Sequence, residues 1–432
     1  MSADKKASRR HFLAGELAGM FAEVLDAAAQ QMAFLPQGHG LGKPADLVRV
    51  SRRAMAALFE VYFSASQYPR GTEKALAALE VLEPLEARLS LFRPDSQLNY
   101  VNANAAFEPV RPHAAVFDLI KLGLQVWRET AGAFDLTATP LWELWGFARR
   151  SARIPAGDEI QAALRYVGSQ FVELDCQAQT VRFLKEGIRL SFASLGKGYA
   201  LDRCAERLLA LGVGDFLIHG GYSSVIARGS IAGNVTESAA AAEQSDNLQC
   251  RFGLPPDALR LANLLEADSA PCQSAGHSVS HSAGRYTAHC TAHCTAQAVE
   301  SPEQTGGWVV GVKHPLRKGR RVAEIRLCDG ALSTSGSGVQ SLIYRGRRYG
   351  HIIDPRTGWP AQSLLSVTVV APTAVLAEAL STAFFVLGLE QSAQYCAEHR
   401  DVGAVVVCPA RRPGGVDVHV LGLSDQQVRL LV

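Results

Sequence analysis

The 432-residue sequence lacks several features that define common protein classes. Its 43 Lys and Arg against 41 Asp and Glu give a formal net charge of +2, too balanced for a nucleic-acid-binding surface. It has no uncharged apolar run approaching the ~20 residues of a transmembrane segment. Its nine cysteines are odd in number and scattered, which does not indicate a disulfide framework. We therefore expect one large or two medium globular domains with no nucleic-acid partner and no transmembrane segment.

The N-terminus also lacks a complete export signal. Arg9 and Arg10 resemble the pair of a twin-arginine signal, but acidic residues interrupt the apolar stretch of ~7–15 residues that should follow. The first cysteine is Cys176, so we expect no lipoprotein anchor near the N-terminus. We expect a loosely attached arm over residues 1–45 and a cytoplasmic protein, with twin-arginine export to the cell envelope as the alternative.

One long segment interrupts the globular pattern of residues 46–432. Residues 231–306 are rich in Ala, Ser, His and Gln, which predicts a largely disordered surface insertion. Its tandem "TAHCTAHC" imitates the spacing of a zinc site at His289, Cys290, His293 and Cys294. Because the motif is a literal repeat inside low-complexity sequence, we expect no metal there.

The order of the expected elements favours an α+β fold. Helical spacing of leucines predicts a helix over 71–92 that Pro84 should kink or end. Two short runs, 179–184 and 187–192, are plausible paired strands. The remaining expected helices are 115–134, 155–167, the segment after Lys197 and 373–390; the remaining expected strands are 307–315, 364–372, 402–409 and 417–423.

A Gly-flanked lysine precedes the helix that starts near Lys197. The turn "SLGKG", residues 194–198, brings unpaired backbone N–H groups, the positive end of a helix dipole and a cation together, which favours an anion. Gly196 and Gly198 should let the backbone approach that anion closely. The turn lacks the upstream glycine of a phosphate-binding P-loop. An ordinary helix-start turn and a Schiff-base lysine therefore stay open.

Two further features could carry chemistry. Glu378 and Thr382 lie four residues apart on one helix, a pair of hard oxygen donors that suits Mg²⁺ shared with a phosphate. Alternatively, Glu378 favours the helix dipole and Thr382 bonds back to its own helix. His351 precedes a Pro-x-x-Gly turn and is either poised beside a cleft or simply hydrogen-bonded at a strand end. The hydroxyl-rich "STSG" at 333–336 lacks the GxSxG of a nucleophile elbow.

The order of these pieces resembles one known family. From about Met55 to the C-terminus, seven blocks are similar to the FAD:protein FMN transferases, the ApbE family. They include "LSLFRPDSQLNYVN", "AFDLTATPLWELWGF", "SLGKGYALDRCAERLLALGV", "STSG", "HIIDPRTGWP" and "SVTVVAPTAVLAEALSTAFFVLG". The N-terminal arm and the 231–306 insertion fall outside the resemblance.

The resemblance implies an α+β fold that holds FAD in a cleft between a mixed sheet and helices, with Mg²⁺ on the pyrophosphate. The enzyme transfers the FMN half to a Thr or Ser hydroxyl of a target flavoprotein and releases AMP. His351 matches a histidine that helps to deprotonate the acceptor hydroxyl. By position, the implied metal ligands are Ser194, Glu378 and Thr382, and the implied FAD contacts are Met55, Phe92, Ala133, Phe134, Asp135, Ser191, Lys197 and Ile353.

The sequence departs from the family pattern at several of these positions. Ser191 and Glu378 stand where the family usually has Asp, Tyr222 replaces a small polar residue, and Ala56-Ala57 replace Gly-Thr. A lost carboxylate should weaken Mg²⁺ binding or shift the preference towards Mn²⁺ or Ca²⁺. The transferase is the expected function; a metal-dependent FAD pyrophosphatase and a non-catalytic FAD-binding protein are the alternatives.

Overall fold

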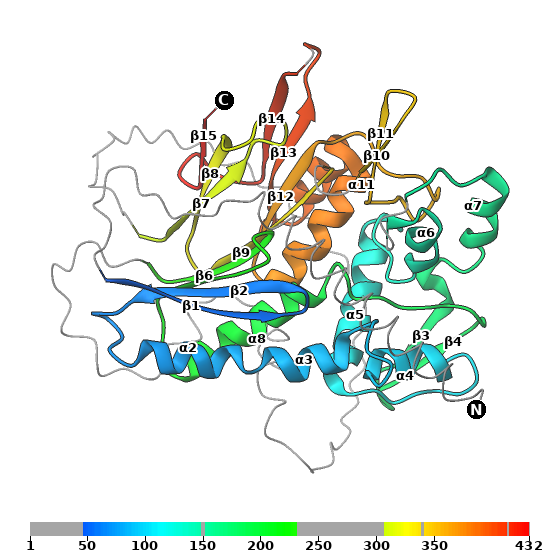
Figure 1. Ribbon diagram of the computed structural model, residues 1–432, viewed down its shortest axis with the longest axis horizontal. Helices are drawn as coiled ribbons and strands as arrows, with labels where there is room; N and C mark the ends of the chain where they lie inside the picture. The colour runs from blue at the N-terminus through cyan, green and yellow to red at the C-terminus, as the bar shows by residue number, and fades with distance from the viewer. Residues whose placement is uncertain (1–45, 148–151, 231–305, 338–340, 413, 432) are drawn as a thin grey trace, which may run out of the picture. The chain divides into compact units, whose positions relative to one another are not determined.

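The computed structural model describes residues 46–147, 152–230, 306–337, 341–412 and 414–431 (Figure 1). The expected N-terminal arm, the Arg9-Arg10 pair and nearly all of the 231–306 insertion, with its His/Cys repeat, lie outside the described residues. The described residues combine helices with antiparallel sheets. This arrangement confirms the α+β class.

An eight-stranded sheet forms the centre of the fold. Its strands, in spatial order, are β1 (Leu47–Ala54), β2 (Ala57–Ser64), β5 (Phe216–Gly220), β6 (Ser224–Arg228), β9 (Gly330–Gly336), β12 (Ser366–Ala371), β13 (Gly403–Pro409) and β14 (Val416–Leu421). Every neighbouring pair is antiparallel. The expectation of a mixed sheet was therefore wrong: even β12 and β13, which α11 connects, run antiparallel.

The two faces of this sheet bury different apolar layers. The face that carries Ala404 and Val406 belongs to the main core, which includes residues of α2 (Gly71–Leu79), α3 (Leu82–Leu89), α8 (Gly196–Ala210) and α11 (Ala374–Glu398). The alternate residues Val405 and Val407 pack instead in a second core with a three-stranded sheet. That sheet consists of β7 (Trp308–Lys313), β8 (Arg321–Leu327) and β15 (Val428–Leu430). The period of two along β13 explains its continuous apolar sequence, since both faces are buried.

The remaining described elements lie beside this framework. A third apolar cluster joins Trp145, Ile160 and Ile353. The elements are α4 (Gln97–Asn104), α5 (Ala114–Glu129), α6 (Thr139–Leu144), α7 (Gly157–Leu164), the 3-10 helix η2 (Ser169–Phe171), β3 (Val172–Asp175), β4 (Thr180–Phe183), β10 (Ser341–Tyr344) and β11 (Arg347–Gly350).

Two sequence-based expectations were wrong in detail. The 71–92 helix breaks between α2 and α3, before Pro84, which then lies in the first turn of α3, where a missing N–H costs nothing. The 187–192 segment is not a strand, and β4 pairs with β3. The Asn102 side chain accepts from the Leu190 N–H at 2.8 Å and donates to its carbonyl at 3.0 Å, so a side chain satisfies this backbone.

The long helix α11 is a core element. Among the described helices it alone has the length and apolar character of a membrane span, and 67% of that apolar window is buried inside the fold. Gly388, with φ of 80°, interrupts its helical geometry. Its burial against the sheet accounts for its apolar sequence.

The strands on either side of the insertion meet. The indole N–H of Trp308, the first residue of β7, donates to the carbonyl of Arg228, the last residue of β6, at 3.0 Å. The chain therefore leaves the described fold after β6 and re-enters it at nearly the same place.

The tight turn between β1 and β2 is strained. Ala54 pairs with Ala57, leaving Met55 (φ 50°) and Ala56 (φ 54°) as a two-residue turn. Both residues have the left-handed conformation that this hairpin turn requires and that favours Asn-Gly. Met55 is one of the residues that the family resemblance implies to contact FAD. Backbone strain of this kind is frequent at functional sites.

We expect Ala56→Gly to raise the free energy of unfolding by about 1 kcal/mol, because glycine removes the Cβ clash of the left-handed conformation. The matched control is Ala57→Gly, which places glycine in β2 and should destabilise the protein. Urea unfolding followed by tryptophan fluorescence measures both. A destabilised Ala56→Gly variant would contradict the turn geometry.

Candidate functional site

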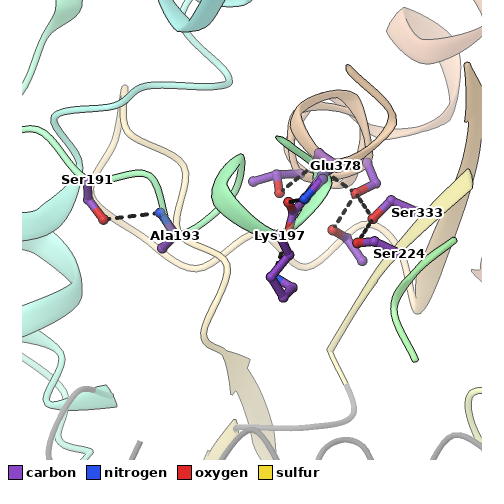
Figure 2. Close-up of polar contacts among 10 residues, drawn as sticks. Ser191, Ala193, Lys197, Ser224, Ser333 and Glu378 are labelled. Atoms are coloured by element: carbon purple, nitrogen blue, oxygen red, sulfur yellow. Dashed lines mark hydrogen bonds and ion pairs between the residues drawn. The ribbon is translucent and has the colours of Figure 1, made fainter. Parts of the chain in front are cut away.

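The first turn of α8 holds a buried ion pair. The ammonium of Lys197, the second residue of α8, pairs with Oε1 of Glu378 on α11, and the backbone N–H of Gly198 donates to Glu378 Oε2 at 2.6 Å (Figure 2). The two side chains are only 19% and 6% exposed. The helix N-terminus that the sequence assigned to an anion therefore binds one here, and that anion is a protein carboxylate.

The second helix is bound in the same way. Asp202 of α8 accepts the backbone N–H of Ala374 at 2.8 Å and of Val375 at 2.9 Å, in the first turn of α11. Burial raises the pKa of Asp202 to about 6, while these two hydrogen bonds oppose the rise. The helices can approach because residue 198 is glycine: a Cβ there would lie 2.4 Å from the Ala374 carbonyl oxygen. Gly198 thus serves helix contact, and the close approach to a phosphate expected from the sequence stays a prediction.

The β1–β2 turn and the β5–β6 turn lie beside Lys197. A Cβ on Gly221 would stand 3.2 Å from the Cβ of Ala57 and 3.9 Å from the Cδ of Lys197. The Met55 N–H donates to a carboxylate oxygen of Glu86 at 2.9 Å, which holds the strained turn. Gly221 therefore links Lys197 to Ala57, the residue that follows the Met55–Ala56 turn.

A group of hydroxyls adjoins Glu378 (Figure 2). Ser333 Oγ lies 3.1 Å from Ser224 Oγ and 3.5 Å from Ser381 Oγ, and Ser335 Oγ lies 3.0 Å from Ser381 Oγ. The Thr382 hydroxyl donates to the Glu378 carbonyl at 3.3 Å. This is the bond to its own helix that the sequence analysis gave as the alternative to metal binding. The sequence pointed to the 333–336 hydroxyls but gave no sign that they meet α11.

The donors around Glu378 suit a hard cation only in part. Glu378 offers a carboxylate and Thr382, one turn further along α11, a hydroxyl, the donor types that Mg²⁺ prefers, while the metal role of Ser194 stays a prediction. No group of three or more His, Cys, Asp or Glu side chains able to hold a metal occurs in the described ranges. A cation here would need oxygens from a bound ligand, and Glu378 would exchange its Lys197 contact for it.

A second set of predicted residues surrounds Leu136. Ala133 and Phe134 are buried in the main core, and the Leu136 carbonyl accepts the Ser191 N–H at 2.9 Å. Asp135 organises its own loop. Its carboxylate accepts the N–H and hydroxyl of Thr137, at 2.8 and 2.6 Å, and the N–H and hydroxyl of Ser169, at 2.9 and 2.8 Å.

The loop before α8 carries Ser191 and Ser194. Ser191 Oγ accepts the Ala193 N–H at 3.3 Å and lies apart from the Lys197–Glu378 pair (Figure 2). Ser194 is half-buried in the turn that leads into α8. Phe92, between α3 and α4, is 43% exposed. The assignment of these residues to metal or FAD stays a prediction.

His351 and Ile353 lie at a third location. His351 directly follows β11, and Ile353 is buried in the cluster around Trp145. The indole N–H of Trp145 donates to the Gly358 carbonyl at 2.9 Å, which fixes the following turn. A Cβ on Gly132 would lie 3.6 Å from the Cγ of Arg356 in that turn, next to the 133–135 loop. The catalytic role of His351 remains a prediction.

The expected FAD cleft also remains a prediction. A surface cavity of about 670 Å³ lies near α3 and the start of α5, and none of the predicted site residues lines it. Its lining residues are Pro84, Ala87, Arg88, Asp95, Gln97, Arg111, Pro112 and His113.

Sequence reasoning missed a buried charged group in the sheet. Glu60 Oε2 accepts the Tyr62 hydroxyl at 2.8 Å and lies 2.7 Å from His219 Nε2, and the Tyr222 ring stacks on His219 with centroids 4.5 Å apart. Burial raises the pKa of Glu60, but the contacts with His219 and Tyr62 outweigh it and hold that pKa below its usual value. The signal was available: a Glu stands between Phe59 and Val61 in a buried strand.

A sequence model of the ApbE family matches residues 55–236 and 292–406. The chain belongs to the ApbE family. It is 23% identical over 375 residues to the FAD:protein FMN transferase of Haemophilus influenzae, covering 84% of this chain and 87% of that protein. It is 26% identical over 347 residues to the Treponema pallidum protein of the same name, covering 78% of each chain.

Solved ApbE structures share the fold. The Thermotoga maritima ApbE protein superposes with a TM-score of 0.62 at 24% identity, covering 87% of this chain and 97% of that chain. The apo flavinyl transferase ApbE of Pseudomonas stutzeri gives the same TM-score and identity, with 87% and 94% covered. At these identities the likeness establishes the fold alone.

We expect Asp202→Asn to lower the free energy of unfolding by about 2–3 kcal/mol, because its amide nitrogen meets a backbone N–H and leaves a buried donor unpaired. Glu73→Gln is the matched control: Glu73 lies in the first turn of α2 and pairs with Arg70, and both side chains are exposed, so its loss should cost less than about 1 kcal/mol. Urea unfolding compares the two. Equal losses would show that Asp202 does not cap α11.

Proposed function

We propose that this ApbE-family protein transfers FMN from FAD to a Thr or Ser hydroxyl of an acceptor flavoprotein and releases AMP, in a metal-dependent reaction. The observation that carries the proposal is the Lys197–Glu378 pair in the first turn of α8, with Gly221 next to Lys197 and Ala57 next to Gly221. This neighbourhood offers a cation and a helix N-terminus to a pyrophosphate and a carboxylate to a metal. The relatives named FAD:protein FMN transferase support the same reaction.

The chemistry is a phosphoryl transfer. The acceptor oxygen forms a bond to the phosphorus of the FMN half, the P–O bond to the AMP half breaks, and AMP leaves with that oxygen. His351 takes the proton of the acceptor hydroxyl, a task that suits an imidazole near neutral pH. Lys197 turns from Glu378 to the pyrophosphate and binds its negative charge.

A divalent cation fits the same residues. Glu378 and Thr382 on α11 and Ser194 before α8 would hold it together with pyrophosphate oxygens. When bound, Mg²⁺ would neutralise the negative charge that develops on the phosphate oxygens. Glu378 is one methylene longer than the usual Asp of the family, and its carboxylate contacts both Lys197 and the Gly198 N–H.

The test of the function uses the purified full chain with FAD and Mg²⁺, with and without a flavoprotein domain that carries an acceptor threonine. In-gel flavin fluorescence reports transfer and chromatography reports AMP. We expect fluorescence on the acceptor together with AMP. AMP and free FMN without labelled acceptor would establish a pyrophosphatase instead, and tight FAD binding without either product would establish a non-catalytic FAD-binding protein.

The ion pair makes metal binding depend on FAD. Without FAD, the Glu378 carboxylate is occupied by Lys197, so we expect weak Mn²⁺ binding that FAD strengthens. Lys197→Met removes the competing cation and should tighten Mn²⁺ binding without FAD by roughly tenfold, about 1.4 kcal/mol. The same variant should bind FAD more weakly.

Isothermal titration with Mn²⁺, with and without FAD, measures this effect. Lys121→Met, an exposed lysine on α5, is the matched control and should leave both affinities unchanged. Unchanged Mn²⁺ affinity in Lys197→Met would show that Lys197 and the metal do not compete for Glu378.

A further inference from the structure

The β10–β11 hairpin exposes an unusual combination of side chains. Its turn region carries three exposed arginines, Arg345, Arg347 and Arg348, and none of them has a carboxylate partner within the residues described. Beside them, Ile343 is 67% exposed and Tyr344 is 45% exposed. Positive charge next to exposed apolar surface is typical of a protein-binding site.

The hairpin is nevertheless anchored at its base. The Tyr349 ring lies 5.8 Å from the Trp145 ring and 6.5 Å from the Trp359 ring, measured between centroids. The Gln362 amide donates to the Arg348 carbonyl at 3.3 Å and accepts from the Arg347 side chain. These contacts hold the base of the projecting β10–β11 hairpin, which Figure 1 shows, in a fixed position.

The hairpin leads directly to the proposed base. β11 ends at Gly350 and the next residue is His351. Arg348 is three residues from His351, so their Cα atoms are no more than about 11 Å apart. A protein that brings a hydroxyl to His351 would come within reach of the Arg348 guanidinium group, and Arg347 and Arg345 follow along the same hairpin towards its turn.

We propose that the β10–β11 hairpin docks the acceptor protein through acidic residues that flank its target hydroxyl. The inference rests on the transferase function proposed above. Arg345 and Arg348 bind the flanking carboxylates, and Ile343 and Tyr344 contact apolar residues of the same segment. The FAD pyrophosphate is a competing anion for the arginines, but Lys197 and the first turn of α8 already offer it a binding position.

The test uses the full chain with a double charge reversal, Arg345→Glu with Arg348→Glu. This pair leaves Arg347 and its contacts with Gln362 and Tyr349 in place. The matched control is Arg317→Glu with Lys318→Glu, which makes the same charge change in an exposed turn between β7 and β8. The probe is a flavoprotein domain whose acceptor threonine is flanked by acidic residues.

We expect the hairpin variant to raise the KM for the acceptor at least about tenfold, with unchanged FAD affinity and unchanged turnover at saturating acceptor. Transfer by the parent protein should weaken at high salt, and transfer by the variant should depend on salt less. An acceptor with its flanking acids changed to Lys should restore transfer by the hairpin variant. The control variant should behave as the parent protein does.

Three results would overturn the inference. Equal acceptor KM values for the hairpin variant and the control would remove the hairpin from acceptor binding. A loss of FAD affinity with no change in acceptor KM would assign the arginines to the nucleotide. Absence of transfer by the unmodified protein to any acceptor would overturn the proposed function itself, and is distinguished by that measurement from failure of the docking surface.

Discussion

The mutual capping of α8 and α11 is the interaction on which the candidate site depends. The first N–H groups of a helix have no partner within the helix, and burial makes that deficit costly. Here each helix supplies a carboxylate to the other: Glu378 to Gly198, and Asp202 to Ala374 and Val375. The exchange fixes both helices in position and in rotation. It therefore determines where the Lys197 ammonium and the Glu378 carboxylate can lie.

This arrangement shows why structural and functional explanations of one residue need not compete. The sequence offered a helix-dipole role for Glu378 as the alternative to metal binding. That alternative was wrong as stated, because Glu378 does not lie in the first turn of α11; its carboxylate binds the N-terminus of α8 instead. A carboxylate held by a helix N-terminus and an ammonium is already placed and largely desolvated. A cation that replaces Lys197 would meet a ligand whose position is set in advance.

Much of the fold was predictable because it follows from local periodicity. The period of 3.6 predicted α5 and α11, and short apolar runs predicted β7, β12 and β13. Pairing between distant segments was not predictable, since periodicity reports only a residue's near neighbours. Lys197 and Glu378, for example, are 181 positions apart in the sequence. The apolar segment 187–192 was wrongly predicted as a strand, because the sequence does not show that the Asn102 side chain bonds the backbone of Leu190. The sequence therefore allowed the candidate site residues to be proposed one by one, but it did not predict which of them contact one another.

The junction at Arg228 and Trp308 has a consequence for how this domain tolerates change. The Arg228 carbonyl and the Trp308 indole nitrogen are 3.0 Å apart. The two strand ends therefore meet whatever the length of the chain between them. Closing a flexible loop costs free energy that grows with the logarithm of its length, about 0.6 kcal/mol for each doubling. Insertions and deletions between β6 and β7 should therefore change the free energy of unfolding of the domain only slightly. This is the position at which the fold can most readily accept or lose a long segment.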